Sequence, residues 1–226
     1  MELHPNTQKQ AITRGAEQPW LASPLKGVDR RMLERIGDEV ARATTIVRYA
    51  PGSYFSPHTH TGGEEFLVLE GVFSDEHGDF PAGTYVRNPV GSAHKPHSEG
   101  GCTILVKLWQ MPADDQAWVR ADTTDPAGYS AVAPGLSVMA LHQTDFESVA
   151  MWQLDAGASL SRRMFKAGAE FFVVDGAFDS EQGSFARHDW LRLPPGDGTT
   201  ITSATGARLY VKTGHLDKPL PLPNGG

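Results

Sequence analysis

Four side chains with the chemistry of metal ligands stand at short spacings in this sequence. His58 and His60 are separated by one residue, and Glu64 and His94 follow them. Residues two apart on a β-strand project from the same face, so both imidazoles of the pair can reach a common ion. Three imidazoles and a carboxylate suit zinc, iron, manganese, nickel or copper, whereas calcium prefers oxygen ligands. The pattern predicts one divalent metal site.

The residues between these ligands predict how they are positioned. Gly62 and Gly63 permit a turn directly before Glu64. Glu64 has the same strand parity as Phe66, which should face an apolar interior. His94 follows a Pro-x-Gly turn, which would bring a neighbouring strand beside the first. We therefore expect the ligands to converge inside a small β-barrel.

The rest of the chain has the composition of a globular protein made of short strands. Of its 226 residues, 39% are hydrophobic and 21% are charged, and it contains 24 glycines and 16 prolines. Turn residues recur at intervals of about eight to twelve positions, which is typical of an all-β sandwich or barrel. Residues 30–36 would allow a helix, but Gly37 and the β-branched run at 43–47 favour strands.

Charge, cysteine content and hydropathy exclude several classes of protein. The net charge of −7 makes a broad phosphate-binding surface, and hence direct nucleic-acid binding, unexpected. The single cysteine, Cys102, rules out an intramolecular disulfide, and its apolar neighbours predict a buried, inert thiol. No apolar run reaches the roughly 18 residues of a membrane helix, and the first residues lack the apolar core of a signal peptide. We expect a cytoplasmic protein with no membrane partner.

An internal repeat defines the domain organisation. With a shift of 105 residues, 52–107 aligns without a gap on 157–212, and about 18 of the 56 pairs are identical. The identical residues are mostly glycines, prolines and aromatics that set turns and fill barrel interiors. We predict an arm over residues 1–26, a first barrel over 27–120, a linker over 121–134 and a second barrel over 135–226.

The second copy lacks all four predicted ligands. Their positions are occupied by Arg163, Phe165, Ala169 and Thr199. The second barrel is therefore predicted to be a structural or partner-binding copy without a metal. Arg162, Arg163 and Lys166 are either solvated surface charges or the lining of a vacant mouth that holds an anion.

Two residues beside the predicted ligands need a separate interpretation. Glu65 competes with Glu64, but it is repeated as Glu170 in the copy that has lost its ligands, which indicates a structural role. Glu64 is thus the preferred ligand. His97, three residues after His94, is either a loop histidine or a side chain that orients a ligand or substrate.

The same residues resemble the two sequence motifs of the cupins. Gly52-x5-His58-x-His60-x3-Glu64-x6-Gly71 is similar to the first motif, and Gly83-x5-Pro89-x-Gly91-x2-His94 to the second, with Ser98 at a position where asparagine is usual. The wider segment resembles the cupin domain of the ChrR family of zinc-binding anti-sigma factors. This resemblance implies a jelly-roll bicupin (a double-stranded β-helix) and a divalent ion, most simply zinc, bound by His58, His60, Glu64 and His94.

The resemblance leaves several functions open. The ChrR pattern implies a regulatory or sensor protein whose partner is a sigma factor or a small-molecule ligand. The small N-terminal zinc domain of that pattern is not expected here, because residues 1–26 contain no cysteine. The same ligands also suit a mononuclear metal dioxygenase that acts on a small organic substrate. A metal-free sugar-nucleotide epimerase would leave the complete ligand set unexplained.

Apolar runs at 66–73 and 171–178 need cover from the other half of the chain or from a second subunit, as in a homodimer.

Overall fold

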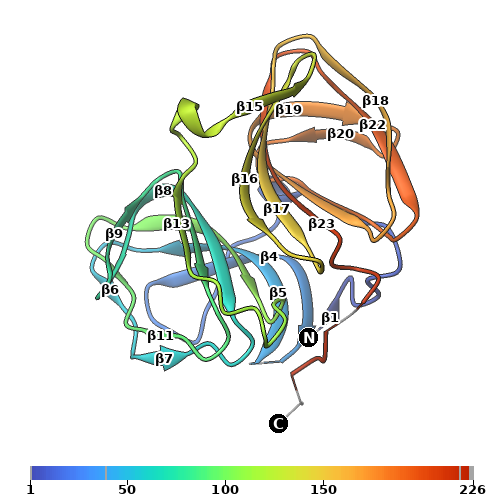
Figure 1. Cartoon of the computed structure of the whole chain (residues 1–226). Helices are drawn as coiled ribbons and strands as arrows, with labels where there is room; N and C mark the ends of the chain where they lie inside the picture. The colour runs from blue at the N-terminus through green and yellow to red at the C-terminus, as the bar shows by residue number, and fades with distance from the viewer. Residues whose placement is uncertain (1, 39, 219, 224–226) are drawn as a thin grey trace. The chain divides into compact units, whose positions relative to one another are not determined.

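Two units of antiparallel β-sheet make up the chain in the computed structural model (Figure 1). The structure describes residues 2–38, 40–218 and 220–223. The first unit contains residues 2–5, 18–124 and 220–223, and the second contains residues 6–17 and 125–218. Within the described residues, no helix has the length and apolar character needed to cross a membrane. The expectation of a strand rather than a helix at residues 30–36 is confirmed, because they lie in a strand.

The first unit contains most of the short strands near the predicted metal site. Its strands are β1 (Glu2–Leu3), β3 (Leu21–Ala22), β4 (Val28–Gly37), β5 (Ala41–Tyr49), β6 (Ser53–Tyr54), β7 (His58–Thr59), β8 (Glu64–Asp75), β9 (Gly78–Pro81), β10 (Thr84–Asn88), β11 (Ala93–His94), β12 (His97–Ser98), β13 (Cys102–Leu108) and β14 (Val119–Asp122).

The second unit repeats this succession with longer, less interrupted strands. Its elements are β2 (Ala11–Thr13), β15 (Ser130–Ala133), β16 (Leu136–Gln143), β17 (Ser148–Leu154), β18 (Ala158–Phe165), β19 (Ala169–Ser180), β20 (Gly183–Ala186), β21 (Trp190–Leu193), β22 (Asp197–Ser203), β23 (Ala207–Thr213) and the 3-10 turns η1 (Gly15–Glu17) and η2 (Pro126–Gly128).

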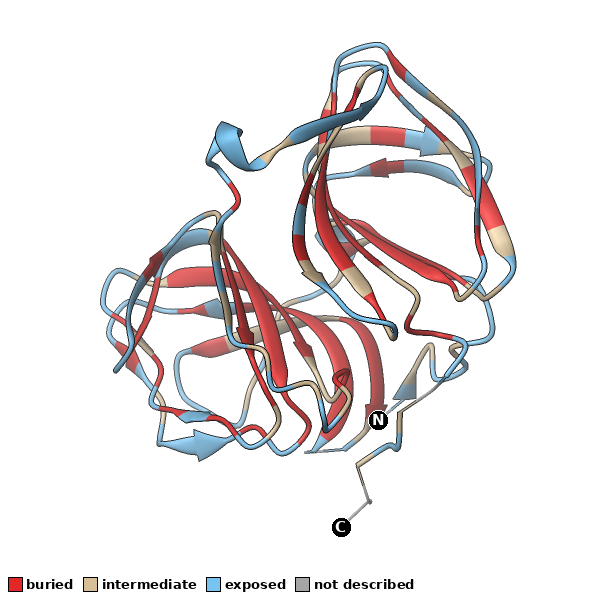
Figure 2. Ribbon diagram, in the orientation of Figure 1, coloured by how far each residue is buried: buried red, intermediate tan, exposed pale blue. Residues whose placement is uncertain are grey.

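The two units share one sheet topology. The main path of the first sheet is β1-β4-β5-β13-β8-β10-β14, and that of the second is β15-β16-β17-β23-β19-β21-β2. Each strand of the first path has its counterpart at the same place in the second. Buried side chains concentrate on these sheets in both units (Figure 2). The predicted all-β, duplicated architecture is therefore confirmed.

Side chains repeat their contacts as well as their positions. Ser98 Oγ donates a hydrogen bond to the carbonyl oxygen of Val72 at 2.7 Å, and Ser203 Oγ donates to that of Ala177 at 2.6 Å. Both serines are buried, so each bond satisfies a hydroxyl that water cannot reach. Ser98 thus has the same structural bond as its counterpart in the copy without ligands.

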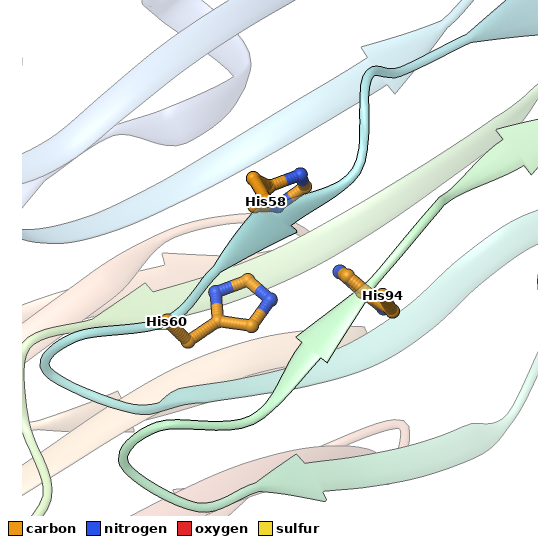
Figure 3. A group of neighbouring side chains, drawn as sticks. All are labelled: His58, His60 and His94. Carbon is orange, nitrogen blue, oxygen red and sulfur yellow. The ribbon is translucent and has the colours of Figure 1, made fainter.

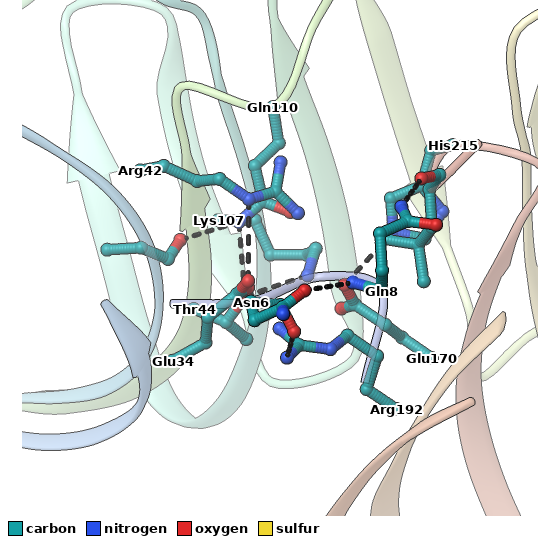
Figure 4. A network of polar contacts seen from close by, with 12 residues as sticks. Asn6, Gln8, Glu34, Arg42, Thr44, Lys107, Gln110, Glu170, Arg192 and His215 are labelled. Carbon is teal, nitrogen blue, oxygen red and sulfur yellow. Dashed lines mark hydrogen bonds and ion pairs between the residues drawn. The ribbon is translucent and has the colours of Figure 1, made fainter. Parts of the chain in front are cut away.

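The segment expected to be an arm contributes a strand to the second unit. Strand β2 pairs with β21, so that Ala11 lies opposite Arg192. Arg192 Nη2 donates to the carbonyl oxygen of Asn6 at 2.7 Å, and Gln8 Nε2 donates to that of Leu216, also at 2.7 Å (Figure 4). In the first unit, β14 occupies the corresponding place beside β10.

Each core is aromatic around its middle strands. In the first unit Phe66 packs against Phe73 with ring centroids 4.6 Å apart, and in the second Phe178 stacks on Phe185 at 4.8 Å. Cys102 belongs to the first core, and its burial raises the pKa of the thiol to about 11. The prediction of a buried cysteine is confirmed.

A polar network is buried beside the first core. Lys107 Nζ donates to Thr44 Oγ1 at 2.8 Å, and the same hydroxyl donates to Glu34 Oε2 at 3.2 Å (Figure 4). Gln110 Nε2 donates to the carbonyl oxygen of Ala43 at 2.8 Å. Charged groups are costly to bury unless they are paired. A shift in the register of β4, β5 and β13 would separate these partners, so the bonds disfavour it.

The repeat makes a prediction about two equivalent glycines. A Cβ at Gly71 would lie 2.2 Å from the carbonyl oxygen of Gly101, and one at Gly176 would lie 2.2 Å from that of Gly206. Both glycines also have φ near +75°. We expect Gly71→Ala and Gly176→Ala each to cost at least about 1–2 kcal/mol, seen as a lower midpoint in thermal unfolding. Gly100→Ala, where no atom lies within 4 Å, should leave the midpoint unchanged; equal effects at all three positions would contradict the prediction.

Candidate metal centre

Two short strands hold the predicted histidines next to one another. Strands β7 and β11 pair with each other, and His58 lies opposite His94 in their register. His60 follows β7 at the point where the chain enters its glycine turn. The three rings converge on a common point (Figure 3). Their centroids are 4.7–5.1 Å apart, and their nearest ring nitrogens all lie within 4.8 Å of one another.

Close packing requires the glycine pair that separates His60 from Glu64. A Cβ at Gly62 would lie 2.2 Å from the ring of Trp109, and Gly63 has φ of +73°. Only a chain without side chains at these positions makes the turn beneath the indole. The turn returns the chain to β8 with Glu64 as its first residue.

Hydrogen bonds on the outer side of two rings set which nitrogen faces inward. His58 Nδ1 lies 3.0 Å from the carbonyl oxygen of Ser56, and His94 Nδ1 lies 3.0 Å from Asp75 Oδ2. Both partners can only accept, so each Nδ1 carries the hydrogen, and each Nε2 lone pair is left for an ion. A carboxylate behind a ligating histidine orients the ring and makes it more basic. Asp75 is a residue that reasoning from the sequence missed.

The carboxylate of Glu64 completes the group. Its Oε2 lies 3.3 Å from His60 Nε2 and 3.6 Å from His94 Nε2. Asn88 Nδ2 donates to the same oxygen at 3.0 Å, and Arg120 Nη2 donates to Asn88 Oδ1 at 2.7 Å. This chain of donors holds the carboxylate toward the imidazoles.

Glu65, the competing carboxylate, faces a different set of partners. Tyr85 Oη donates to Glu65 Oε2 at 2.7 Å, and Arg87 pairs with the same oxygen at 3.2 Å. In the second unit, Glu170 accepts a hydrogen bond from Trp190, the counterpart of Tyr85. The repeated glutamate therefore has an equivalent structural partner in both copies.

Burial and neighbouring charges shift the two inner imidazoles in opposite directions. Burial lowers the pKa of His60, and the charge of Glu64 offsets this only in part. Burial also acts to lower the pKa of His94, but the hydrogen bond to Asp75 and the charge of Glu64 outweigh it, so the pKa is raised.

His97 stays outside the cluster and stacks on Tyr54 with ring centroids 5.5 Å apart.

The donor atoms fit a divalent ion. His60 Nε2 and His94 Nε2 are buried and have no hydrogen-bond partner. Leaving such atoms unpaired costs about 1–3 kcal/mol each, and a cation between them would satisfy both. Three imidazole nitrogens and a carboxylate oxygen are also the mixed donor set that first-row transition metals prefer.

All four predicted ligands line one cavity of about 510 Å³. Its walls are mainly apolar, and Arg30 contributes a charged side chain to the lining. This volume falls within the range of pockets that bind small molecules. Apolar residues of the lining include Val47, Tyr49, Phe55, Ile104, Val106 and Trp109.

Solved structures with the same fold include several enzymes. A candidate dioxygenase from Nostoc punctiforme has a TM-score of 0.71 at 14% identity, over 99% of this chain and 85% of that one. Salicylate 1,2-dioxygenase from Pseudoaminobacter salicylatoxidans has a TM-score of 0.67 at 12% identity, over 92% and 82%. Oxalate decarboxylase OxdC from Bacillus subtilis, as a deletion mutant, has 0.63 at 12%, over 91% and 77%. At these identities the likeness concerns the fold alone.

The duplicated jelly-roll barrel, with three histidine side chains converging in one copy, defines the class as a bicupin. A model of the ChrR cupin-like domain matches residues 8–112 and again residues 119–217. The chain therefore belongs to the ChrR cupin-like family. None of the curated proteins matches the sequence.

The hydrogen bond behind His94 yields a testable prediction. Asp75→Asn keeps the shape of the side chain but removes the negative charge that orients and polarises the imidazole. We expect metal affinity to fall by about 10- to 100-fold, measured by competition with a chelator of known affinity. Asp79→Asn is the matched control, because Asp79 accepts from Ser74 and does not contact the histidines. Equal affinities for Asp75→Asn and the parent protein would contradict this role.

Proposed function

We propose that the first barrel binds one divalent ion through His58, His60, Glu64 and His94 and acts as a metal-dependent dioxygenase on a small organic substrate. The observation that carries the proposal is that all four residues line a single cavity of ligand size. A structural zinc site is closed by its protein ligands, whereas a catalytic site keeps a position open. The cavity beside the imidazoles offers room for that position and for a substrate.

The lining indicates the kind of substrate. Arg30 lies half-buried on β4 among apolar walls, and its Nε is buried without a hydrogen-bond partner. Among the described residues, no carboxylate forms an ion pair with it. An unpaired guanidinium in an apolar pocket favours a substrate that carries a carboxylate or a similar anionic group. The apolar walls would hold its hydrocarbon part.

Two residues behind the predicted ligands fix the orientation of the ligand side chains. Asp75 holds the proton of His94 at Nδ1, and Asn88 holds Glu64 toward the rings. When bound, a redox-active ion such as iron would supply the electronic coupling between dioxygen and an organic substrate. Both atoms of dioxygen would enter the product, so no other oxidant is required. Arg30 would orient the substrate by its anionic end.

A regulatory or sensor function, with zinc in the same site, is the second candidate. It is favoured by the match to the ChrR cupin-like domain. In that function the ion would be held by protein ligands alone, and a sigma factor or another protein would be the partner. The two functions therefore differ in whether the bound ion has a position open to an added ligand.

Nitric oxide, a probe for open positions on ferrous iron, distinguishes the two functions. Protein loaded anaerobically with ferrous iron should give the electron paramagnetic resonance signal of an iron–nitrosyl complex, and His58→Ala/His94→Ala should not. A substrate found in a panel of small organic acids should then give a product that contains two atoms of ¹⁸O from ¹⁸O₂. Stoichiometric zinc in a four-coordinate site that accepts no added ligand would contradict the dioxygenase and favour the sensor.

Arg30 carries a separate prediction about substrate binding. Salicylate serves as the anionic probe and salicylamide as its neutral analogue. We expect Arg30→Met to weaken the binding of salicylate to the metal-loaded protein by about 10- to 100-fold, as a charge-assisted hydrogen bond contributes about 1.5–3 kcal/mol, measured by calorimetry.

Arg48→Met is the control, because Arg48 lies on the neighbouring strand β5, pairs with Asp29 and stacks on Trp20. Its affinity for salicylate and its metal content should equal those of the parent protein. If Arg30→Met bound salicylate as tightly as the parent protein, the Arg30 guanidinium would not contribute to substrate binding.

A further inference from the structure

The second barrel has an arginine at the place of a histidine ligand. Arg163 lies opposite Thr199 in the pairing of β18 with β22. The equivalent pair in the first barrel is His58 opposite His94. The same two strand positions that carry imidazoles in one copy thus carry a guanidinium and a hydroxyl in the other.

A β-bulge lies immediately before this arginine. Along β18 the register shifts between Leu160 and Arg163, so that three steps on this strand match two on β22. Bulges redirect the side chains that follow them and are frequent next to binding sites. The guanidinium of Arg163 comes to lie over aromatic rings, 5.4 Å from the centroid of Trp152 and 6.0 Å from that of Phe165.

The arginine lines a cavity of about 540 Å³ in the second barrel. The buried residues Leu136, Trp152 and Ile201 form apolar walls, and Met164 is an exposed apolar side chain of the lining. Hydroxyl groups come from Ser159, Ser161 and Thr199. This combination of an apolar interior with a few polar groups is typical of a small-molecule site.

The charges around the cavity leave Arg163 available. Arg162 pairs with Glu181 at 3.0 Å and with Asp197 at 3.7 Å. The carboxylate of Glu181 also accepts hydrogen bonds from the Thr199 hydroxyl and the Thr200 amide. In the part of the chain that the structure describes, no carboxylate pairs with Arg163. Stacking on aromatic faces leaves the N–H groups at the edge of a guanidinium free for a planar anion.

We propose that the second barrel binds a small organic carboxylate with an apolar body. The guanidinium of Arg163 pairs with the carboxylate, and Leu136, Trp152 and Ile201 contact the apolar part. The site lies at the strand positions that are equivalent to those of the metal ligands in the first barrel, but it needs no ion. It is therefore independent of the metal-dependent function proposed above.

Binding of phenylacetate, measured by calorimetry, tests this site. The first barrel is silenced in a background of Arg30→Met with His58→Ala and His94→Ala, so that binding there does not contribute. We expect one phenylacetate per chain in this background. Arg163→Met should weaken binding at least tenfold, whereas Arg162→Met, with its own acidic partners, should change it less than twofold.

Three outcomes would overturn the proposal. The first is equal affinity for phenylacetate in Arg163→Met and the background protein. The second is loss of all binding when the first barrel alone is silenced. The third is equal affinity for phenylacetamide or acetate, because the amide lacks the charge and acetate lacks the apolar body. Arg163 is exposed, so its substitution should leave the fold intact, and an unchanged thermal midpoint verifies this.

Discussion

Two buried imidazole nitrogens without a hydrogen-bond partner are the constraint on which the first barrel depends. His60 Nε2 and His94 Nε2 are buried, and both lie close to the carboxylate of Glu64. Several elements hold them there, among them the pairing of β7 with β11, the turn at Gly62 and the bond from His94 to Asp75. A bound cation would turn this unfavourable arrangement into a stable one.

The second barrel has the same sheet topology as the first but different side chains at the positions of His58 and His94. Equivalent serines make the same hydrogen bond in both copies, and equivalent glutamates each accept a hydrogen bond from the residue at the same strand position, a tyrosine in one copy and a tryptophan in the other. Arg163, by contrast, stands in place of His58. One fold thus presents a cluster of imidazoles in one copy and a guanidinium over aromatic rings in the other.

Local spacing and internal repetition made much of this fold predictable. The histidine pair, the glycine turn and the 105-residue repeat all depend on neighbours in sequence or on a constant shift. Asp75 and Arg30 were not predicted as parts of the site, because neither stands at a spacing from the histidines that marks it as a partner; the structure places one behind His94 and the other in the lining of the cavity. Strand β2 was missed because its three residues show no periodicity and gain their partners from β21. Residues in a motif or repeat could thus be predicted, whereas single charged residues that strand pairing brings to the site could not.

Anomalous diffraction from crystals of the metal-loaded protein tests the central claim most directly. We expect one anomalous peak per chain, surrounded by the side chains of His58, His60, Glu64 and His94 and open on one side to the cavity that Arg30 lines. A peak at any other place, or none in crystals grown with an excess of the ion, would contradict it.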